Sequence, residues 1–281
     1  MRVPLRALAL SLVAGMLLSA PARAEFPSDV PDRFQLGLGG MFGVFDTGVA
    51  VGPSDGPVNL MIVLEDALNL DVHDNFLTTD GFWRFGGRHY LDVGYMDVER
   101  KAHQEVDQAF EFGRYTFGLG AQADGWFASR FAYAAYRYDF LQLEPVRISG
   151  SAGMSIGRLD GGVSATGNIT DENGTVVNGQ TTVESKYTVP LPLLGFQLDW
   201  ALTPRSVLQA YNRTIWVDFS TLRGGMSDVV FRYHWYFVPH AAVGIGYERL
   251  NVSLPKYITE DQVQRFAYTV QGLTLYLRGA Y

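Results

Sequence analysis

The last ten residues, Gly272 to Tyr281, read GLTLYLRGAY, and this stretch decides the fold class. Counted back in twos from the end, one set of residues is mostly apolar: Tyr281, Gly279, Leu277, Leu275 and Leu273. The residues between them are small, polar or charged: Ala280, Arg278, Tyr276, Thr274 and Gly272. This two-residue period is typical of a β-strand whose two faces meet different environments. The apolar face would meet a core in a soluble sandwich and lipid in a membrane barrel.

The same alternation appears in six earlier segments, which are residues 34–44, 90–95, 148–157, 194–200, 229–237 and 242–248. A single alternating segment is weak support for any fold. Six of them together with the terminal one, in a chain that we expect to be secreted, predict a transmembrane β-barrel. A soluble β-sandwich secreted to the periplasm is the alternative.

The N-terminus has the pattern of a secretory signal peptide. Arg2 and Arg6 precede an apolar run from Ala7 to Ala20, and Ala22-Arg23-Ala24 supplies small residues for a cleavage site. We therefore predict a signal peptide at residues 1–24 and a barrel domain at 25–281. An uncleaved membrane anchor is the alternative, but the apolar run is short for a membrane span.

Composition limits the classes of function. The chain has no cysteine, which excludes disulfides, thiolate metal sites and a lipid-modified cysteine. Residues 25–281 hold 19 basic and 29 acidic residues, so we expect no nucleic-acid partner. No later segment approaches 18 consecutive apolar residues, yet aromatic residues make up 14% of the chain. A membrane protein without apolar helices must be a closed barrel, because lipid cannot satisfy an open sheet edge.

We predict ten antiparallel strands at about 34–45, 76–86, 88–99, part of 112–141, 146–160, 183–202, 206–218, 228–238, 240–250 and 265–281. Short connections rich in Gly and Pro alternate with long ones. This asymmetry is typical of short periplasmic turns and long extracellular loops. Val58 to Leu70 is either part of a folded first loop or another strand pair, so eight or twelve strands stay open. The apolar positions change from odd to even residue numbers between Tyr247 and Leu250, which predicts a β-bulge or a strand exit near Glu248–Arg249.

Aromatic side chains gather near the predicted short turns. Amphipathic rings favour the headgroup level of a membrane, so we predict a periplasmic girdle. Its expected members are Trp83, Phe85, Tyr136, Tyr138, Trp200, Trp235, Phe237, Tyr276 and Tyr281.

The opposite faces of the strands predict a charge network in the lumen. Its expected members are Asp80, Arg84, Arg88, Asp92, Arg137, Asp139, Asp199, Arg232, His234, Glu248 and Arg278. Five basic residues oppose five acidic ones in this set. A barrel of eight to ten strands has little free interior, and charges there must pair or keep their water. The balanced set therefore favours a cross-linked, mostly plugged lumen over a selective channel lined by one sign of charge.

Two motifs carry a resemblance to known proteins. Residues 82–95, FWRFGGRHYLDVGY, resemble a hairpin found in a large, mostly uncharacterised group of Gram-negative outer-membrane β-barrels. Residues 242–249, AVGIGYER, and the C-terminal strand are similar to the same group. The terminal alternation also resembles the signal read by the barrel-assembly machinery, which usually ends on Phe where this chain has Tyr281. The resemblance implies a fold and an outer-membrane location, and it transfers no functional residue.

Catalytic and metal sites have weak support in the sequence. His73 and His103 lie in predicted loops near carboxylates, but their spacing matches no metal template. His234 is expected to face the lumen as a satisfied polar residue. No G-x-S-x-G elbow is present. We therefore predict no catalytic residue, no metal and no cofactor.

These observations predict a monomeric outer-membrane barrel that is not an enzyme. The leading interpretation is a structural or adhesion-type barrel, or a narrow pore for small solutes, and the balanced lumen favours the former. The alternative is a barrel enzyme that acts on lipid or peptide at the outer leaflet. The expected partners are outer-membrane lipid, lipopolysaccharide and, during biogenesis, the barrel-assembly machinery.

Overall fold

The computed structural model describes residues 26, 33–53, 62–112, 114–177, 179–218, 222–258 and 262–281. Ten long strands form its main sheet: β1 (Phe34–Pro53), β3 (His73–Gly86), β4 (His89–Glu105), β7 (Gln122–Leu143), β8 (Val146–Thr166), β10 (Gln180–Thr203), β11 (Ser206–Asp218), β12 (Leu222–Val238), β13 (Ala241–Ile258) and β14 (Gln262–Ala280). Each strand pairs antiparallel with its neighbours, and β14 pairs with β1 to close the barrel. The predicted ten-stranded barrel is confirmed. The predicted signal peptide lies outside the described residues.

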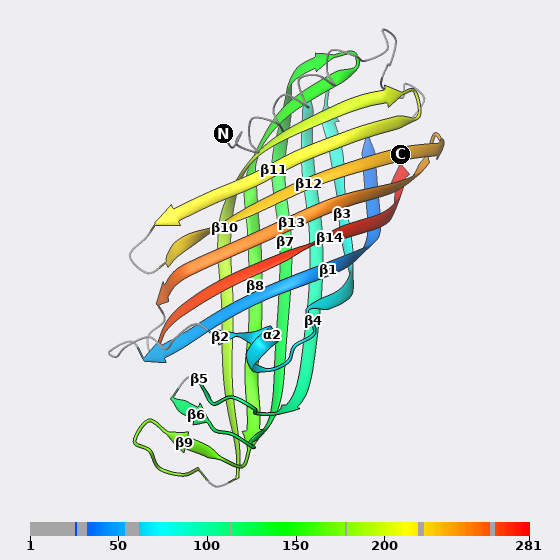
Figure 1. Cartoon of the computed structure of the whole chain (residues 1–281). Coiled ribbons are helices and arrows are strands. Elements are labelled where there is room, and N and C mark those ends of the chain that lie inside the picture. The colour runs from blue at the N-terminus through cyan, green and yellow to red at the C-terminus, as the bar shows by residue number, and fades with distance from the viewer. Residues whose placement is uncertain are drawn as a thin grey trace, which may run out of the picture.

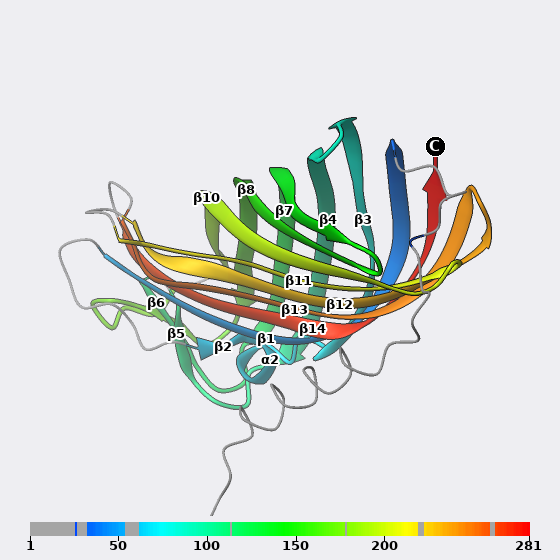
Figure 2. The same cartoon turned by 90° about the horizontal axis from the view of Figure 1, so that it is seen from above.

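The two ends of the barrel differ in their connections. Two-residue turns join β3 to β4, β7 to β8, β10 to β11 and β12 to β13. The C-terminus lies at this end, while the small strands β5 (Phe110–Phe112), β6 (Tyr115–Phe117) and β9 (Ile169–Asp171) lie at the far tip of the opposite end (Figure 1). Figure 2 shows the strands curving around a common axis. The end with short turns is therefore the periplasmic end.

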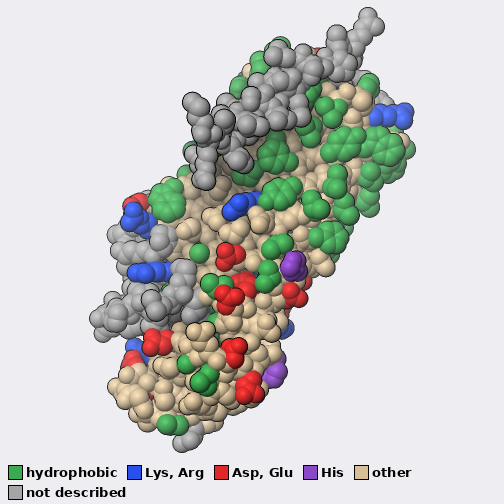
Figure 3. Space-filling model, viewed as in Figure 1, with side chains coloured by type: hydrophobic (Ala, Val, Ile, Leu, Met, Phe, Trp, Pro, Cys, Tyr) green, Lys and Arg blue, Asp and Glu red, His purple; other side chains and the backbone are tan. Residues whose placement is uncertain are grey.

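The exterior of the periplasmic half carries an apolar band. On β14, Leu273, Leu275 and Leu277 are 54%, 50% and 64% exposed. On β1, Leu36 and Leu38 are also exposed. Figure 3 shows hydrophobic side chains gathered over this part of the surface, with charged side chains more frequent toward the other end. Large apolar side chains on an exterior strand face indicate contact with lipid.

The extracellular half of the barrel divides into two sheets. Pairing between β10 and β11 starts at Leu194↔Thr214, so residues 180–193 of β10 pair with β8 alone. Pairing between β3 and β4 ends at Thr78↔Met96, and residues 97–105 of β4 pair with β7 alone. Strands β4, β7, β8 and β10 thus extend as one sheet, and Figure 1 shows them reaching past the others. The second sheet contains the ends of β11 to β14 and of β1.

Apolar side chains change faces between the two halves. On β14, Phe266, Tyr268 and Val270 point inward and are at most 1% exposed, although the leucines farther along the strand point outward. The register does not shift at this change, because pairing with β1 is continuous from Gln35↔Ala280 to Pro53↔Gln262. Beyond the membrane the exterior meets water, so the apolar residues occupy the interior face instead.

This change of faces corrects the predicted bulge at Glu248–Arg249. Pairing of β13 with β14 runs without a shift from Ala241 to Leu254, and the irregularity lies between Leu254 and Tyr257. Leu250 is 4% exposed and points inward. The parity of the apolar residues changes because the environment changes, and the backbone stays regular.

The first extracellular loop is folded in its described part. It contains β2 (Ile62–Val63), which pairs with β1, and the helical turn α2 (Leu64–Ala67). Leu64, Leu68 and Leu70 are buried. The part of Val58–Leu70 that the structure describes is therefore a folded loop, as one of the two predicted alternatives states.

The extracellular tip is a small three-stranded sheet. β6 pairs with both β5 and β9, and the hairpin that follows β9 is held by Asp171. The Asp171 carboxylate accepts hydrogen bonds from the backbone N–H groups of Thr175 at 2.8 Å and Asn173 at 2.9 Å. These bonds lower the pKa of Asp171 below its ordinary value, because they favour the charged carboxylate.

We expect a charge on the apolar band to destabilise the barrel and the same charge above the band to have little effect. Ile245→Arg places a cation against lipid, and we expect it to lower the free energy of unfolding by about 2–4 kcal/mol. Ser253→Arg, farther along the same strand, is the matched control. Urea unfolding in phospholipid bilayers measures both variants, and equal losses would contradict the position of the band.

Candidate functional site

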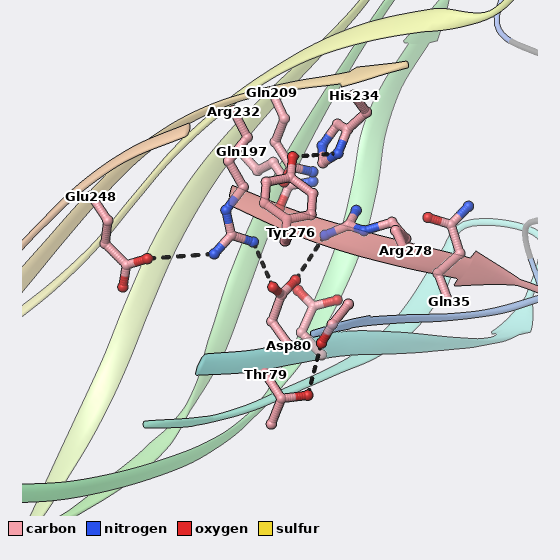
Figure 4. Close-up of polar contacts among 12 residues, drawn as sticks. Gln35, Thr79, Asp80, Gln197, Gln209, Arg232, His234, Glu248, Tyr276 and Arg278 are labelled. Carbon is pink, nitrogen blue, oxygen red and sulfur yellow. Dashed lines mark hydrogen bonds and ion pairs between the residues drawn. The ribbon is translucent and has the colours of Figure 1, made fainter. Parts of the chain in front are cut away.

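The interior of the periplasmic half contains buried ion pairs centred on Asp80. Its two carboxylate oxygens accept from Arg232 and Arg278, each at 2.8 Å. Arg232 also pairs with Glu248 at 3.4 Å. These residues come from β3, β12, β13 and β14, and Figure 4 shows Arg232 and Arg278 pointing to Asp80, with Glu248 on the far side of Arg232. The bridges therefore link strands on opposite sides of the closure between β14 and β1.

A second group of ion pairs is centred on Arg137. Its Nε donates to Asp92 at 2.9 Å and its guanidinium pairs with Asp139 at 3.4 Å. Asp139 also accepts from the Ser149 hydroxyl at 2.6 Å. The Arg137 guanidinium lies 4.0 Å from the centre of the Tyr90 ring. Charge-assisted bonds and a cation–π contact together compensate for the burial of this cation.

Two amides and one phenol contact Asp199 and His234, two further members of the predicted network. The Asp199 carboxylate accepts from Gln197 and Gln209, each at 2.8 Å. His234 is 2% exposed, and its Nδ1 lies 2.6 Å from the Tyr276 hydroxyl. We call all these residues, with the two groups of ion pairs, the charged layer. It is an extensively hydrogen-bonded set with no open row of one charge sign among the described residues.

Two members of the predicted network, Arg88 and Arg84, lie next to the β3–β4 turn, and the prediction for Arg88 needs correction. Arg88 is exposed beside the β3–β4 turn and lies outside the charged layer. The side chain of a turn residue does not follow the inward–outward alternation of a strand, so this alternation could not predict the direction of Arg88. Arg84 is half-buried, with its guanidinium 5.8 Å from the Tyr90 ring centre and one bond to the carbonyl of Gly87.

A buried pair beside the charged layer was not predicted from the sequence. Arg213 on β11 lies 3.8 Å from Asp228 on β12, and both are buried. The Arg213 guanidinium also lies 4.0 Å from the Tyr133 ring centre. Asp228 has the parity of Arg232 on the same strand, so the alternation could have identified it.

The aromatic residues predicted to form the periplasmic girdle point either outward or into the barrel. The outward-facing members are at least partly exposed: Trp83, Phe85, Tyr136, Tyr138, Trp200, Trp235, Phe237 and Tyr281. Tyr276 is 7% exposed and points inward to His234, so its assignment to the girdle was wrong. It has the parity of Arg278 and Thr274, which both face the interior.

An apolar layer fills the interior above the charged layer. We define it by Phe45, Phe127, Phe131, Phe266 and Tyr268, all at most 5% exposed. Ring centres lie 5.5 Å apart for Phe127 and Tyr268 and 5.8 Å apart for Phe127 and Phe266. The Tyr268 hydroxyl lies 3.0 Å from the Ser129 hydroxyl, so its polar atom is satisfied. These contacts join β7 in one extracellular sheet to β14 in the other.

The first loop covers the apolar layer, and a buried ion pair fixes it. Glu65 in α2 accepts from Arg100 at 2.8 Å and from the backbone N–H of Thr47 at 2.9 Å. Arg100 also donates to the Thr47 hydroxyl at 2.6 Å. Leu68 packs on Gly125, where any Cβ would lie 2.7 Å from its Cδ1 atom. We call this arrangement the first-loop cap.

Two of the cavities inside the described part of the barrel are lined by charged residues. One of about 90 Å³ lies at the periplasmic end, lined by charged residues that include Arg147 and Asp199. Phe26 borders it, with its ring centre 4.0 Å from the Arg147 guanidinium and its N–H bonded to Glu144. The other, of about 50 Å³, lies beside Asp80 and Asp228. The Asp80 ion pairs lie at the border of both, since Arg278 lines the first and Arg232 the second.

His73 and His103, which were expected in loops, lie in β3 and β4 and are exposed. The Asp71 carboxylate accepts a hydrogen bond from the backbone N–H of His73 at 2.9 Å, and no group of three potential metal ligands occurs among the described residues. His103 on β4 lies 2.6 Å from Asp124 on β7, and both side chains are more than 60% exposed. This pair is at the extracellular rim, far along the strands from the charged layer.

We expect Arg137→Ala to destabilise the barrel strongly. It leaves Asp92 and Asp139 buried without their cation, which should lower the free energy of unfolding by about 3–5 kcal/mol. Arg88→Ala removes an exposed arginine near the same turns and should change it by less than about 0.5 kcal/mol. Urea unfolding of both variants in detergent or bilayers provides the measurement. If both variants unfold like the native protein, the charged layer does not stabilise this barrel.

No helix in the described part of the chain is long and apolar enough to cross a membrane. No protein-family model matches the sequence, and no curated protein shows significant sequence similarity.

Solved structures show where the fold occurs. The outer membrane protease OmpT from Escherichia coli has a TM-score of 0.59 at 12% identity, over 89% of this chain and 97% of OmpT. Ail, the attachment invasion locus protein of Yersinia pestis, has a TM-score of 0.31 at 12% identity, over 86% of this chain and 97% of Ail. The Pseudomonas putida toluene transporter TodX has a TM-score of 0.33 at 10% identity, over 91% of this chain and 92% of TodX. The likeness to OmpT concerns the fold alone, and the other two scores are too low to support an argument. The chain has the fold of Gram-negative outer-membrane β-barrels, and its apolar band fits the outer-membrane location that the sequence predicts.

Proposed function

We propose that this protein is a non-conducting outer-membrane barrel with a structural or adhesion-type role. In this proposal the lumen is closed along its length, and the two extracellular sheets with their small tip sheet form the surface offered to the outside. The protein would then act through what it presents beyond the membrane.

The apolar layer is the observation that carries this proposal. Phe127, Phe266 and Tyr268 come from opposite sheets and touch one another across the interior. Tyr268 is 0% exposed and Phe266 is 1% exposed, so water does not reach these rings. A path for a polar solute would have to cross this layer, whose phenylalanine rings cannot replace a hydration shell.

The layers on either side support the same proposal. The charged layer contains cations and anions in mutual contact, which differs from the single-sign rings of selective pores. The first-loop cap covers the extracellular side of the apolar layer through the Arg100–Glu65 pair, whose side chains are 2% and 5% exposed. Opening this cap alone would leave the apolar layer in place.

Bilayer recording tests the closed lumen. We expect purified, folded protein in a planar bilayer to give no conductance steps, because the apolar layer leaves no continuous water path. A water-filled porin in the same bilayer is the positive control, and a shift in gel mobility on heating verifies that the barrel is folded. Reproducible steps from the folded protein would overturn the proposal in favour of a small-solute pore.

A second candidate is an enzyme that acts on lipid or peptide at the outer leaflet. The hydrogen-bonded His103–Asp124 pair favours it, because a carboxylate that orients a histidine is a recurring part of general-base sites. In the described part of the chain, however, no hydroxyl donates to His103. Our proposal expects lipid- and peptide-hydrolysis assays to stay at background. Hydrolysis by the native protein that His103→Ala abolishes would establish the enzyme instead.

A further inference from the structure

Two arginines face each other on the exterior of the barrel just above the apolar band. Arg130 on β7 is the direct cross-strand partner of Arg158 on β8. Both belong to the outward face, since their neighbours Phe131 and Leu159 are buried in the interior. Like charges in directly opposed positions destabilise a sheet unless something compensates for them. An anion shared by the two guanidinium groups would provide that compensation.

The protein itself compensates for only one of the two cations. Arg130 contacts Asp97 at 3.2 Å and Asp160 at 4.0 Å. These side chains are 34–43% exposed, so the pairs are screened by water and contribute little. Arg158 is exposed and forms no ion pair with any described residue. No hydrogen bond joins its guanidinium to a residue that the structure describes, so its donors are available to a ligand.

The residues directly below the arginines form an apolar row. Tyr95 pairs with Ala132, and Ala132 pairs with Ile156, on the same outward face two residues closer to the membrane. Tyr95 and Ile156 are 44% and 46% exposed, and Ala132 between them is exposed and small. In this row the small Ala132 therefore stands between an aromatic side chain on β4 and a branched side chain on β8.

Cations above an exposed apolar row at the membrane boundary match the chemistry of a phosphorylated lipid. Arginine binds phosphate with paired, charge-assisted hydrogen bonds, and an acyl chain can lie against the alanine below. We propose that Arg158 and Arg130 bind the phosphate of an outer-leaflet lipid whose acyl chain lies on the row Tyr95–Ala132–Ile156. This site is independent of whether the lumen is closed. It gives the predicted contact with outer-membrane lipid a specific place on β7 and β8.

Arg249 on β13 offers a matched control. It is exposed and follows the lipid-facing Tyr247, so it also lies just above the apolar band. Its cross-strand partners are Val229 and Gln271, so no second cation stands opposite it. General attraction of anionic lipid to a basic surface should involve Arg249 as much as Arg158.

Native mass spectrometry of the detergent-solubilised full chain with lipid A that carries two phosphates tests the site. We expect Arg158→Gln to weaken binding roughly tenfold, the effect of losing a charge-assisted contact, and Arg249→Gln to weaken it less than about twofold. Lipid A without phosphates should bind the native protein about as weakly as the phosphorylated lipid binds Arg158→Gln.

Three results would overturn the proposal. Equal losses in the two variants would mean attraction without a site. Equal binding of the dephosphorylated lipid would mean that the acyl chains alone are recognised. Displacement of the lipid by inorganic phosphate at millimolar concentration would identify a site for a soluble anion. Both arginines are exposed, so the variants should fold, and the shift in gel mobility on heating checks this.

Discussion

The fold depends on one constraint: the exterior of the barrel faces hydrocarbon in the periplasmic half and water in the extracellular half. In the periplasmic half, lipid surrounds the sheet, so leucines such as Leu275 point outward and arginines such as Arg278 point inward. In the extracellular half, water surrounds the sheet, and Phe266 and Tyr268 of the same strand point inward. A two-residue period satisfies both environments with one uninterrupted register, because only the identity of the residues on each face has to change.

The interior layers follow from this change of environment. Polar side chains that avoid lipid must bond to one another, and Asp80 and Arg137 each hold partners from other strands. Above the membrane the two sheets separate at β10–β11 and β3–β4, and an apolar interior then joins them as in a sandwich. The first loop can bury Glu65 and Arg100 at this level because each satisfies the other. The proposed closure of the lumen would thus be a consequence of how the sheet is stabilised.

Much of the fold could be predicted from the sequence because the two-residue period is a local property. The strands, their antiparallel order and the inward position of residues such as Asp92 and Arg232 follow from parity alone. The failures arose where another criterion replaced parity. Tyr276 was placed in the girdle for its residue type, although its parity matches that of Arg278. The irregularity expected near Glu248–Arg249 is absent because lipid does not surround the whole strand, and Leu250 points inward. The Glu65–Arg100 pair joins a loop to a strand. Such a contact produces no periodic pattern in the sequence, so it could not be predicted in this way.

Cysteine scanning of β14 tests this change of environment most directly, because the chain has no native cysteine. Single cysteines at positions 266 to 278, each carrying a nitroxide spin label in bilayers, would report collisions with oxygen and with a water-soluble nickel complex. Labels at 273, 275 and 277 should collide with oxygen, which concentrates in lipid. Labels at 266, 268 and 270 should be protected from both reagents. A strand with oxygen access at every second residue over its whole length, or nickel access at the three leucine positions, would contradict the account.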